Sequence, residues 1–412
     1  MGLTSSMKSI SATRRQSGAV SIFSVIIAAL LLSVITVSFI RVMTNEQQQA
    51  SNNDLSQSAY DSALSGTEDA KRALLRYATI CKTSTEATCK NLADKINSDT
   101  CNEVVRLGNI IGSDSENKDG KVSGTYGEIL IRQSEDDERL DQAYTCVKAD
   151  LNTPDYVGKL SANESKLIPL KTDPASPNPT FTTVTLQWFT SEDVKSDTKV
   201  VNLQPPAATL PLLSQEDWGE TRPPLMRTQL MQVGKNFTLD SFDNNTSTQS
   251  NANTMFLYPI GTTGSTSSIS GNWTFLNRDV RRSGSIAPLG NNCKGSVKNG
   301  GYACTARLNL PEPIGNTAGD NTRGDAYLRL TALYNTTHFR VTLGGGSEFH
   351  AVQPSIDSTG RANEFFRRIE SRVDLENTNF PFPEAAVDIT NSLCKAFVIT
   401  DQEADYSNSC SL

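Results

Sequence analysis

Arg14-Arg15-Gln16-Ser17-Gly18 is followed by an uncharged, mostly apolar run from Ala19 to Ile40. Residues in an α-helix rise about 1.5 Å each, so this run would extend about 33 Å as a helix. The hydrocarbon core of a bilayer is about 30 Å thick. Residues 19–40 are therefore predicted to form a transmembrane helix, and one end of the protein belongs in a membrane.

The same helix is predicted to continue to about Tyr77. No proline occurs before Pro154, so no helix breaker of this kind interrupts the chain. An export signal would have a cleavage site such as Ala-x-Ala after its apolar core, and nothing like it follows Ile40. Small and apolar side chains recur there every three or four residues, at Leu55, Ala59, Ala63, Gly66, Ala70, Ala73 and Tyr77. We expect this stripe to lie against a globular head, because alanine and glycine are poor core residues for a coiled coil.

The basic leader, the Gly18 junction, the apolar helix and its long polar continuation resemble the N-terminus of a type IV pilin. The resemblance is closest to tip-type minor pilins and related pseudopilins, and it covers about sixty of the 412 residues. It implies that prepilin peptidase cuts between Gly18 and Ala19, that residues 1–18 are discarded, and that the new amine of Ala19 is methylated. An ordinary single-pass anchor is the alternative interpretation.

Phe23 departs from the pattern of major pilins, which carry a glutamate at the fifth position of the mature chain. A carboxylate in lipid is costly unless it meets a partner, which in pilins is the N-terminal amine of a neighbouring subunit. Some minor pilins and pseudopilins thought to begin the filament lack the same acid. Our hypothesis is that Phe23 frees this subunit from needing such a partner and that the chain lies at or near a tip.

The charge pattern predicts the orientation in the membrane. Lys8, Arg14 and Arg15 precede the apolar run, so the positive-inside rule places the short N-terminus in the cytoplasm and the bulk outside. The expected location is the cytoplasmic membrane before assembly and an extracellular pilus afterwards. A net charge of -7 and a pI near 5.1 argue against a nucleic-acid partner.

The cysteines indicate an oxidising compartment. All eight follow the apolar run: Cys81, Cys89, Cys101, Cys146, Cys293, Cys304, Cys394 and Cys410. An even number outside the cytoplasm predicts disulfides, although the connectivity stays open. Cys293 and Cys304 bracket a turn and could clamp a hairpin, and Cys394 and Cys410 could close a C-terminal loop. Zinc binding is disfavoured, since the chain has no Cys-x-x-Cys motif and contains only two histidines.

The predicted fold class is α+β: a long N-terminal helix followed by a disulfide-bonded, mainly antiparallel β ectodomain, which forms a sandwich or a pair of small sheets. The expected parts are a leader (1–18), the helix (19–80, with 19–40 transmembrane), a small α+β region (81–168) and a β-rich head (169–412) containing an inserted β-sandwich at 207–320. Strand patterns support the head. Val184, Leu186 and Trp188 alternate with polar residues, and Tyr327–Leu343 is predicted to form a hairpin.

The search for catalytic motifs is negative, so we predict no enzyme, no cofactor and no metal. Common nucleotide-binding, zinc-protease and serine-hydrolase motifs do not occur. His338 and His350 are predicted to be plain surface residues. Residues 115–120 begin like a calcium loop, but Tyr126 stands in place of the bidentate glutamate, so a polar turn is preferred. Arg323-Gly324-Asp325 could bind integrins but arises easily by chance.

Two classes of function remain. In the first, the chain is a structural subunit that packs among other pilin subunits through its N-terminal helix, primes assembly and caps the fibre. In the second, its β region is a binding protein for a host or partner-cell surface ligand, on a pilus or on a simple anchor. The sequence leaves open the ligand, the position in a fibre, and whether the apparatus is a pilus or type II secretion.

Overall fold

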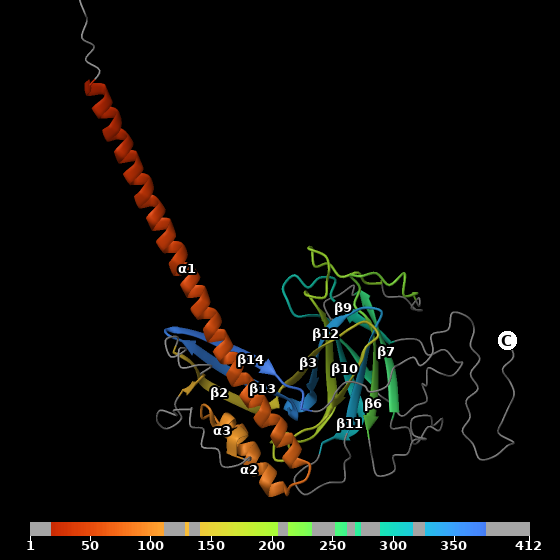
Figure 1. Ribbon diagram of the computed structural model, residues 1–412. Coiled ribbons are helices and arrows are strands. Elements are labelled where there is room, and N and C mark those ends of the chain that lie inside the picture. The colour runs from red at the N-terminus through yellow and green to blue at the C-terminus, as the bar shows by residue number, and fades with distance from the viewer. Residues whose placement is uncertain are drawn as a thin grey trace, which may run out of the picture. The chain divides into compact units, whose positions relative to one another are not determined.

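The computed structural model describes residues 18–110, 128–131, 141–204, 213–232, 252–261, 268–272, 289–315 and 326–375 (Figure 1). The contacts divide the chain into two compact units. Unit 1 comprises residues 1–149 and 356–371, and unit 2 comprises residues 150–355 and 372–412. This division cuts across the predicted ranges 81–168 and 169–412, because two long strands, β2 (Gln142–Thr153) and β13 (Phe349–Ala362), each contribute residues to both units.

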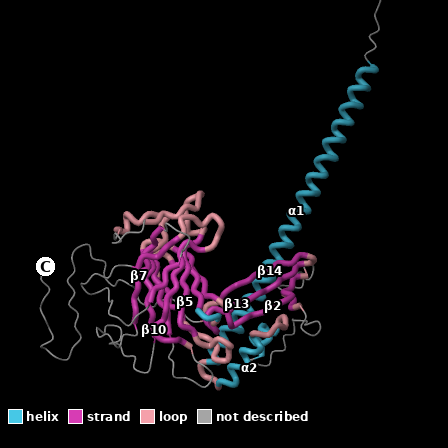
Figure 2. Tube along the Cα trace, turned by 180° about the vertical axis from the view of Figure 1, so that it is seen from behind, coloured by secondary structure: helices cyan, strands magenta, loops and turns pink. Residues whose placement is uncertain are grey.

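Unit 1 is built on α1 (Gly18–Cys81), a single helix of 64 residues. The prediction of one helix from Ala19 to about Tyr77 is therefore confirmed. Two shorter helices follow, α2 (Glu86–Ile96) and α3 (Glu103–Ile110). Two further strands, β1 (Ile129–Leu130) and β14 (Phe365–Arg372), complete a four-stranded sheet in the order β1-β2-β13-β14. Figure 2 shows α1 passing along these strands and continuing beyond them.

The small-residue stripe of α1 is buried in unit 1, as predicted, and its part from Ala59 to Gly66 packs against this sheet. Six of its seven members are buried, namely Ala59, Ala63, Gly66, Ala70, Ala73 and Tyr77, and Leu55 is half-buried. The closest approach is at Gly360 on β13, where an added Cβ would lie 2.2 Å from both Ala59 O and Ala63 N. Ser358 Oγ also donates a hydrogen bond to Ala63 O at 2.7 Å. The backbones of helix and strand therefore touch with no side chain between them.

Among the residues that the structure describes, two disulfides lie in unit 1 and one lies in unit 2. Cys81–Cys89 joins the end of α1 to α2, and Cys101–Cys146 joins the residues before α3 to β2. In unit 2, Cys293 at the end of β9 (Leu289–Cys293) bonds to Cys304 on β10 (Tyr302–Ile314), so the predicted hairpin clamp is confirmed. Cys394 and Cys410 lie outside the described residues, as do the predicted loops at 115–126 and 323–325.

Unit 2 contains a ten-stranded sheet in the order β3-β12-β5-β10-β9-β7-β6-β11-β4, with β8 paired to β10. Its other strands are β3 (Asp155–Leu160), β4 (Ser165–Pro169), β5 (Phe181–Thr190), β6 (Leu225–Gln232), β7 (Ala252–Gly261), β8 (Ser268–Asn272), β11 (Ala326–Leu333) and β12 (Thr337–Leu343), followed by the short 3-10 helix η3 (Gly344–Gly346). The pairings are antiparallel except β7–β9 and β8–β10.

The sheet of unit 2 doubles back on itself around one core. Its two end strands, β3 and β4, are joined by residues 161–164 alone, so both ends of the sheet must lie within the reach of a short turn. Trp188 and Phe339 on one side and Leu328 and Leu330 on the other belong to the same buried cluster. The sandwich expected for the head thus forms from a single folded sheet.

Two sequence predictions for this sheet need correction. Strands β11 and β12 exist where Tyr327–Leu343 predicted them, but they do not form a hairpin: β11 pairs with β4 and β6, whereas β12 pairs with β3 and β5. Residues 334–336 instead carry the chain from one layer to the other. The predicted insertion at 207–320 is also not separate, because its strand β10 pairs with β5, which precedes it in the sequence, and its strand β6 pairs with β11, which follows it.

Candidate functional site

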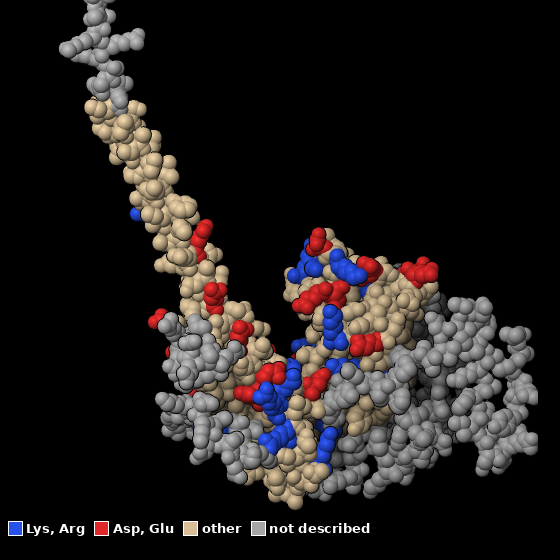
Figure 3. Space-filling model, viewed as in Figure 1, with Lys and Arg blue, Asp and Glu red and all other residues tan. Residues whose placement is uncertain are grey.

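The most unusual surface of unit 1 is the N-terminal part of α1, which we call the apolar segment (residues 22–40). Its large hydrophobic side chains are 51–70% exposed. An 18-residue window in this helix has a mean hydropathy of 2.7 and none of it is buried in the structure. Figure 3 shows this part of α1 almost entirely as uncharged surface. Since each buried side chain of this type gains about 1.5–3 kcal/mol relative to water, the segment is suited to lipid or to other apolar helices.

Two hydroxyl groups of the apolar segment, those of Ser33 and Thr36, donate hydrogen bonds to the helix's own backbone. Ser33 Oγ donates to Leu30 O at 2.8 Å, and Thr36 Oγ1 donates to Ser33 O at 2.9 Å. At the end of the segment, Thr44 Oγ1 donates to Ile40 O at 3.0 Å. Such bonds suit a lipid environment, where no water replaces a missing partner. The segment is compatible with a single-pass membrane anchor.

The predicted processing residues lie at the start of this helix. Gly18 and Ala19 are the first two residues of α1, and Phe23 is 70% exposed. The fifth position of the predicted mature chain thus presents an aromatic ring on an open helix surface. Cleavage after Gly18 stays a prediction from the sequence.

The two histidines are not the plain surface residues that the sequence predicted. His338 Nδ1 lies 2.7 Å from Asp193 Oδ1, and the Asp193 side chain is only 2% exposed. Asp193 Oδ2 also accepts hydrogen bonds from the backbone nitrogens of Thr190 and His338, at 2.8 and 2.9 Å. Asp193 therefore links the ends of β5 and β12, and the pair has a structural role.

His350 is likewise held by the fold. Its Nδ1 lies 2.7 Å from Asn152 Oδ1. Burial lowers the pKa of His350 below its usual value of 6.5, and the charges of Asp173 and Asp150 offset part of that effect. Among the described residues, no group of three or more His, Cys, Asp or Glu side chains could hold a metal ion.

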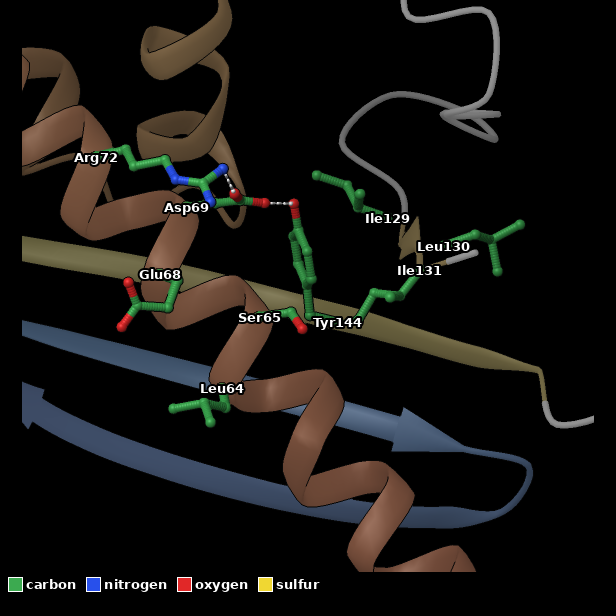
Figure 4. Close-up of a pocket in the computed structure, with 9 residues that line it drawn as sticks. All are labelled: Leu64, Ser65, Glu68, Asp69, Arg72, Ile129, Leu130, Ile131 and Tyr144. Atoms are coloured by element: carbon green, nitrogen blue, oxygen red, sulfur yellow. Dashed lines mark hydrogen bonds and ion pairs between the residues drawn. The ribbon is translucent and has the colours of Figure 1, made fainter. Parts of the chain in front are cut away.

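A groove in unit 1 runs beside α1 and has a volume of about 480 Å³ (Figure 4). It is lined by Leu64, Ser65, Glu68, Asp69, Arg72, Ile129, Leu130, Ile131 and Tyr144. The Tyr144 hydroxyl donates to Asp69 Oδ2 at 2.9 Å, and Arg72 pairs with the other oxygen at 3.3 Å. Burial, with the charge of Asp69, raises the pKa of Tyr144 well above 10, so this phenol stays protonated. The side chains of Asp69, Arg72 and Tyr144 in this groove thus contact one another.

No protein-family model, curated protein or solved structure matches this chain. The pilin resemblance rests on the residues around the leader junction and on the long helix that follows them.

The sequence located the apolar segment but missed the groove and the Asp193–His338 pair. The segment is visible because its signal is local and continuous. Asp69 and Tyr144 are 75 residues apart, and Asp193 and His338 are 145 apart. No motif spacing could have joined them without knowledge of the strand pairing.

Proposed function

We propose that this chain is a minor pilin of a type IV pilus-like filament, incorporated through the apolar segment of α1. The observation that carries the proposal is the continuity of α1. One helix of 64 residues presents uncharged side chains on all sides over its first part and buries a stripe of small residues in unit 1 over its second. A simple anchor needs about 20 residues and gains nothing from extending as the same helix into the head.

The second support is the close packing of α1 against the sheet of unit 1. At Gly66 an added Cβ would lie 2.6 Å from Ser358 Oγ and 2.7 Å from Val147 Cγ2. This contact fixes the second part of the helix to the sheet, so an apolar segment held among other helices would hold unit 1 in a filament. A flexible linker after the membrane would not transmit that constraint.

Phe23 supports a place at or near the tip. A glutamate at this position would need a cation within the apolar environment, whereas the phenylalanine ring gains free energy from burial there. The subunit can therefore enter a membrane or a bundle of apolar helices with no partner amine above it. On this proposal the β-rich unit 2 is presented at the end of the fibre, where it can cap the filament or contact a surface ligand.

The experiment is to determine the N-terminus and intact mass of the native protein from membranes and from sheared surface material. The proposal predicts a chain that starts at methylated Ala19 and has lost two hydrogens for each disulfide. Gly18→Val should block processing, while Gly2→Val, the same change elsewhere in the leader, should leave it intact. An unprocessed Met1 chain found only in membranes would refute the proposal and favour a single-pass anchored binding protein.

Position in the fibre needs a second measurement. Immunogold labelling of the wild-type protein should mark filament ends. Phe23→Glu should add labels along the shaft, because the new carboxylate can pair with the N-terminal amine of a neighbouring subunit. Phe39→Glu, the same change deeper in the apolar segment, serves as the control. Labels distributed along wild-type filaments would contradict the tip position while leaving the pilin assignment intact.

A further inference from the structure

Two rows of polar side chains lie across neighbouring strands of unit 2 on the side opposite the core, the first on β3, β12, β5 and β10 and the second on β12, β5 and β10. The strand pairings place the first row at Asp155, Thr342, Thr185 and Arg307, and the second at Arg340, Gln187 and Thr305. The residues between them along the strands, Tyr156, Val341, Leu186 and Ala306, are buried in the core. Because side chains alternate along a strand, both rows project outward. We call these seven residues, together with Tyr302 and Arg372, the polar face.

The second row is held in one geometry by its own hydrogen bonds. Arg340 Nε and Nη2 donate to Gln187 Oε1 at 2.8 and 2.5 Å. Gln187 Nε2 reaches Thr305 Oγ1 at 3.4 Å. The Arg340 guanidinium also lies over the ring of Tyr302, with 5.4 Å between its Cζ and the ring centroid. A ligand that meets this row would cost little side-chain entropy, because the groups are already ordered.

The polar face carries more positive than negative charge. Asp155 is shared between two guanidinium groups, with Arg372 Nη2 at 3.3 Å and Arg340 Nη1 at 3.9 Å. Arg307 adds an exposed cation in the first row. Within the part of the chain that the structure describes, Arg372 Nη1 is buried without a hydrogen-bond partner. Three guanidinium groups thus face one carboxylate, on a chain whose net charge is -7.

We propose that the polar face binds an anionic polysaccharide built of uronic-acid units. Neighbouring strands are about 4.8 Å apart, close to the length of one pyranose unit, so a linear chain lying along a row can place one sugar on each strand. Guanidinium groups recognise carboxylates through paired hydrogen bonds. Threonine and glutamine supply donors and acceptors for sugar hydroxyls, and the Tyr302 ring supplies an apolar surface for a sugar face.

Other partners fit the polar face less well. Single-stranded nucleic acid is held by successive aromatic platforms, and this face has one ring. The buried centres of protein–protein interfaces are mostly apolar, whereas the polar face has one aromatic ring and otherwise polar or charged members. The proposal rests on unit 2 alone and does not depend on pilin processing or filament assembly.

The test is binding of the full-length protein, purified in detergent micelles, to polygalacturonic acid by isothermal titration calorimetry. Neutral dextran and single-stranded DNA serve as comparison probes. Arg340→Gln combined with Arg372→Gln removes two cations from the face. Arg368→Gln is the matched control, because this arginine is 71% exposed, pairs with Asp357 and belongs to unit 1. If the double variant unfolds, Arg307→Gln replaces it, since this side chain is exposed.

The expected result is binding to polygalacturonic acid that weakens with salt and no binding to dextran. The double variant should bind at least about tenfold more weakly, since a hydrogen bond to a charged group contributes about 1.5–3 kcal/mol. Arg307→Gln should also weaken binding, and Arg368→Gln should not. Failure to bind polygalacturonic acid at low ionic strength would overturn the proposal. Equal losses in the variants and the control, or equally tight binding of single-stranded DNA, would overturn it as well.

Discussion

Gly360→Ala should destabilise unit 1 because its new methyl group has no room. An added Cβ would lie 2.2 Å from Ala59 O and Ala63 N and 2.8 Å from Ser62 C. These are backbone atoms of α1, so they cannot rotate away as the end of a side chain would. The helix must move away from β13, which also strains the hydrogen bond from Ser358 to Ala63.

The expected cost follows from these two effects. Overpacking a well-packed site costs about 1–3 kcal/mol, and a lost hydrogen bond about 0.5–1.5 kcal/mol. Together they give roughly 2–4 kcal/mol, a large share of the stability of a typical domain. Gly295→Ala is the matched control, because no atom lies within 4 Å of its added Cβ. It should change stability by less than about 0.5 kcal/mol.

Hydrogen exchange with peptide resolution separates the two units. In Gly360→Ala, amides in residues 55–77 of α1 should exchange about 30- to 700-fold faster, which corresponds to 2–4 kcal/mol when exchange follows the opening equilibrium. The three tryptophans, Trp188, Trp218 and Trp273, all fall within residues 150–355, so their fluorescence reports on unit 2. In Gly360→Ala, unit 2 should unfold at the same denaturant concentration as in the wild-type protein. Unchanged protection in residues 55–77 would refute the close-packing argument.

The Cys101→Ala, Cys146→Ala double variant should destabilise unit 1 by about 4 kcal/mol because this disulfide closes a 45-residue loop. Removing the Cys81–Cys89 disulfide, whose cysteines are 8 residues apart, should cost only about 2.5 kcal/mol. A larger loss of thermal stability from removing Cys81–Cys89 than from removing Cys101–Cys146 would contradict the loop-entropy account. Arg361→Gln should cost about 1–2 kcal/mol, because the guanidinium holds Glu128 at 2.6 Å but its partners are half-exposed; faster exchange in β1 would report the loss. For His350 the folded pKa is lowered, so the unfolded chain takes up the proton first. The stability of unit 2 should be highest above about pH 6.5, fall as the pH drops below that value, and level off below the folded pKa of His350. The urea midpoint at each pH measures this dependence, and His350→Gln should remove the part that comes from His350.

Local sequence patterns predicted where the helices and strands lie better than they predicted which strands pair with one another. The helix from Gly18 to Cys81 follows from hydropathy and from one stripe of small residues, both of which are local properties. Strand β5 follows from the alternation at Val184, Leu186 and Trp188, which are all fully buried. Alternation sets which face of a strand is buried, but it does not select the neighbouring strand.

The failed hairpin at Tyr327–Leu343 shows that limit. A three-residue connection between two alternating strands favours a hairpin by local criteria. Here Tyr334 adopts a φ of 79°, and Asn335 Nδ2 donates at 2.8 Å to the carbonyl oxygens of both Gly219 and Arg222. These contacts come from residues more than a hundred positions away. The connection therefore forms a corner between layers, which no local pattern could indicate.

The candidate sites divide in the same way. The apolar segment around Phe23 is visible in the sequence because every residue in it contributes to one continuous signal. The polar face depends on the register that sets Arg340 opposite Gln187 on one side and Val157 on the other. These residues look like scattered surface charge until the pairing is known. The Cys101–Cys146 bond belongs to the same class, since spacing alone left the connectivity open.

The folded sheet of unit 2 also fixes an order of events during synthesis. Among the described strands, β3 pairs only with β12 and β4 only with β11, although β3 and β4 are made more than 150 residues before these partners. A ribosome adds about 5–20 residues per second, so both early strands wait for many seconds with unpaired backbone edges. Strands β11 and β12 close the sheet when they arrive. The growing chain therefore needs protection from aggregation mainly in the interval between residues 169 and 343.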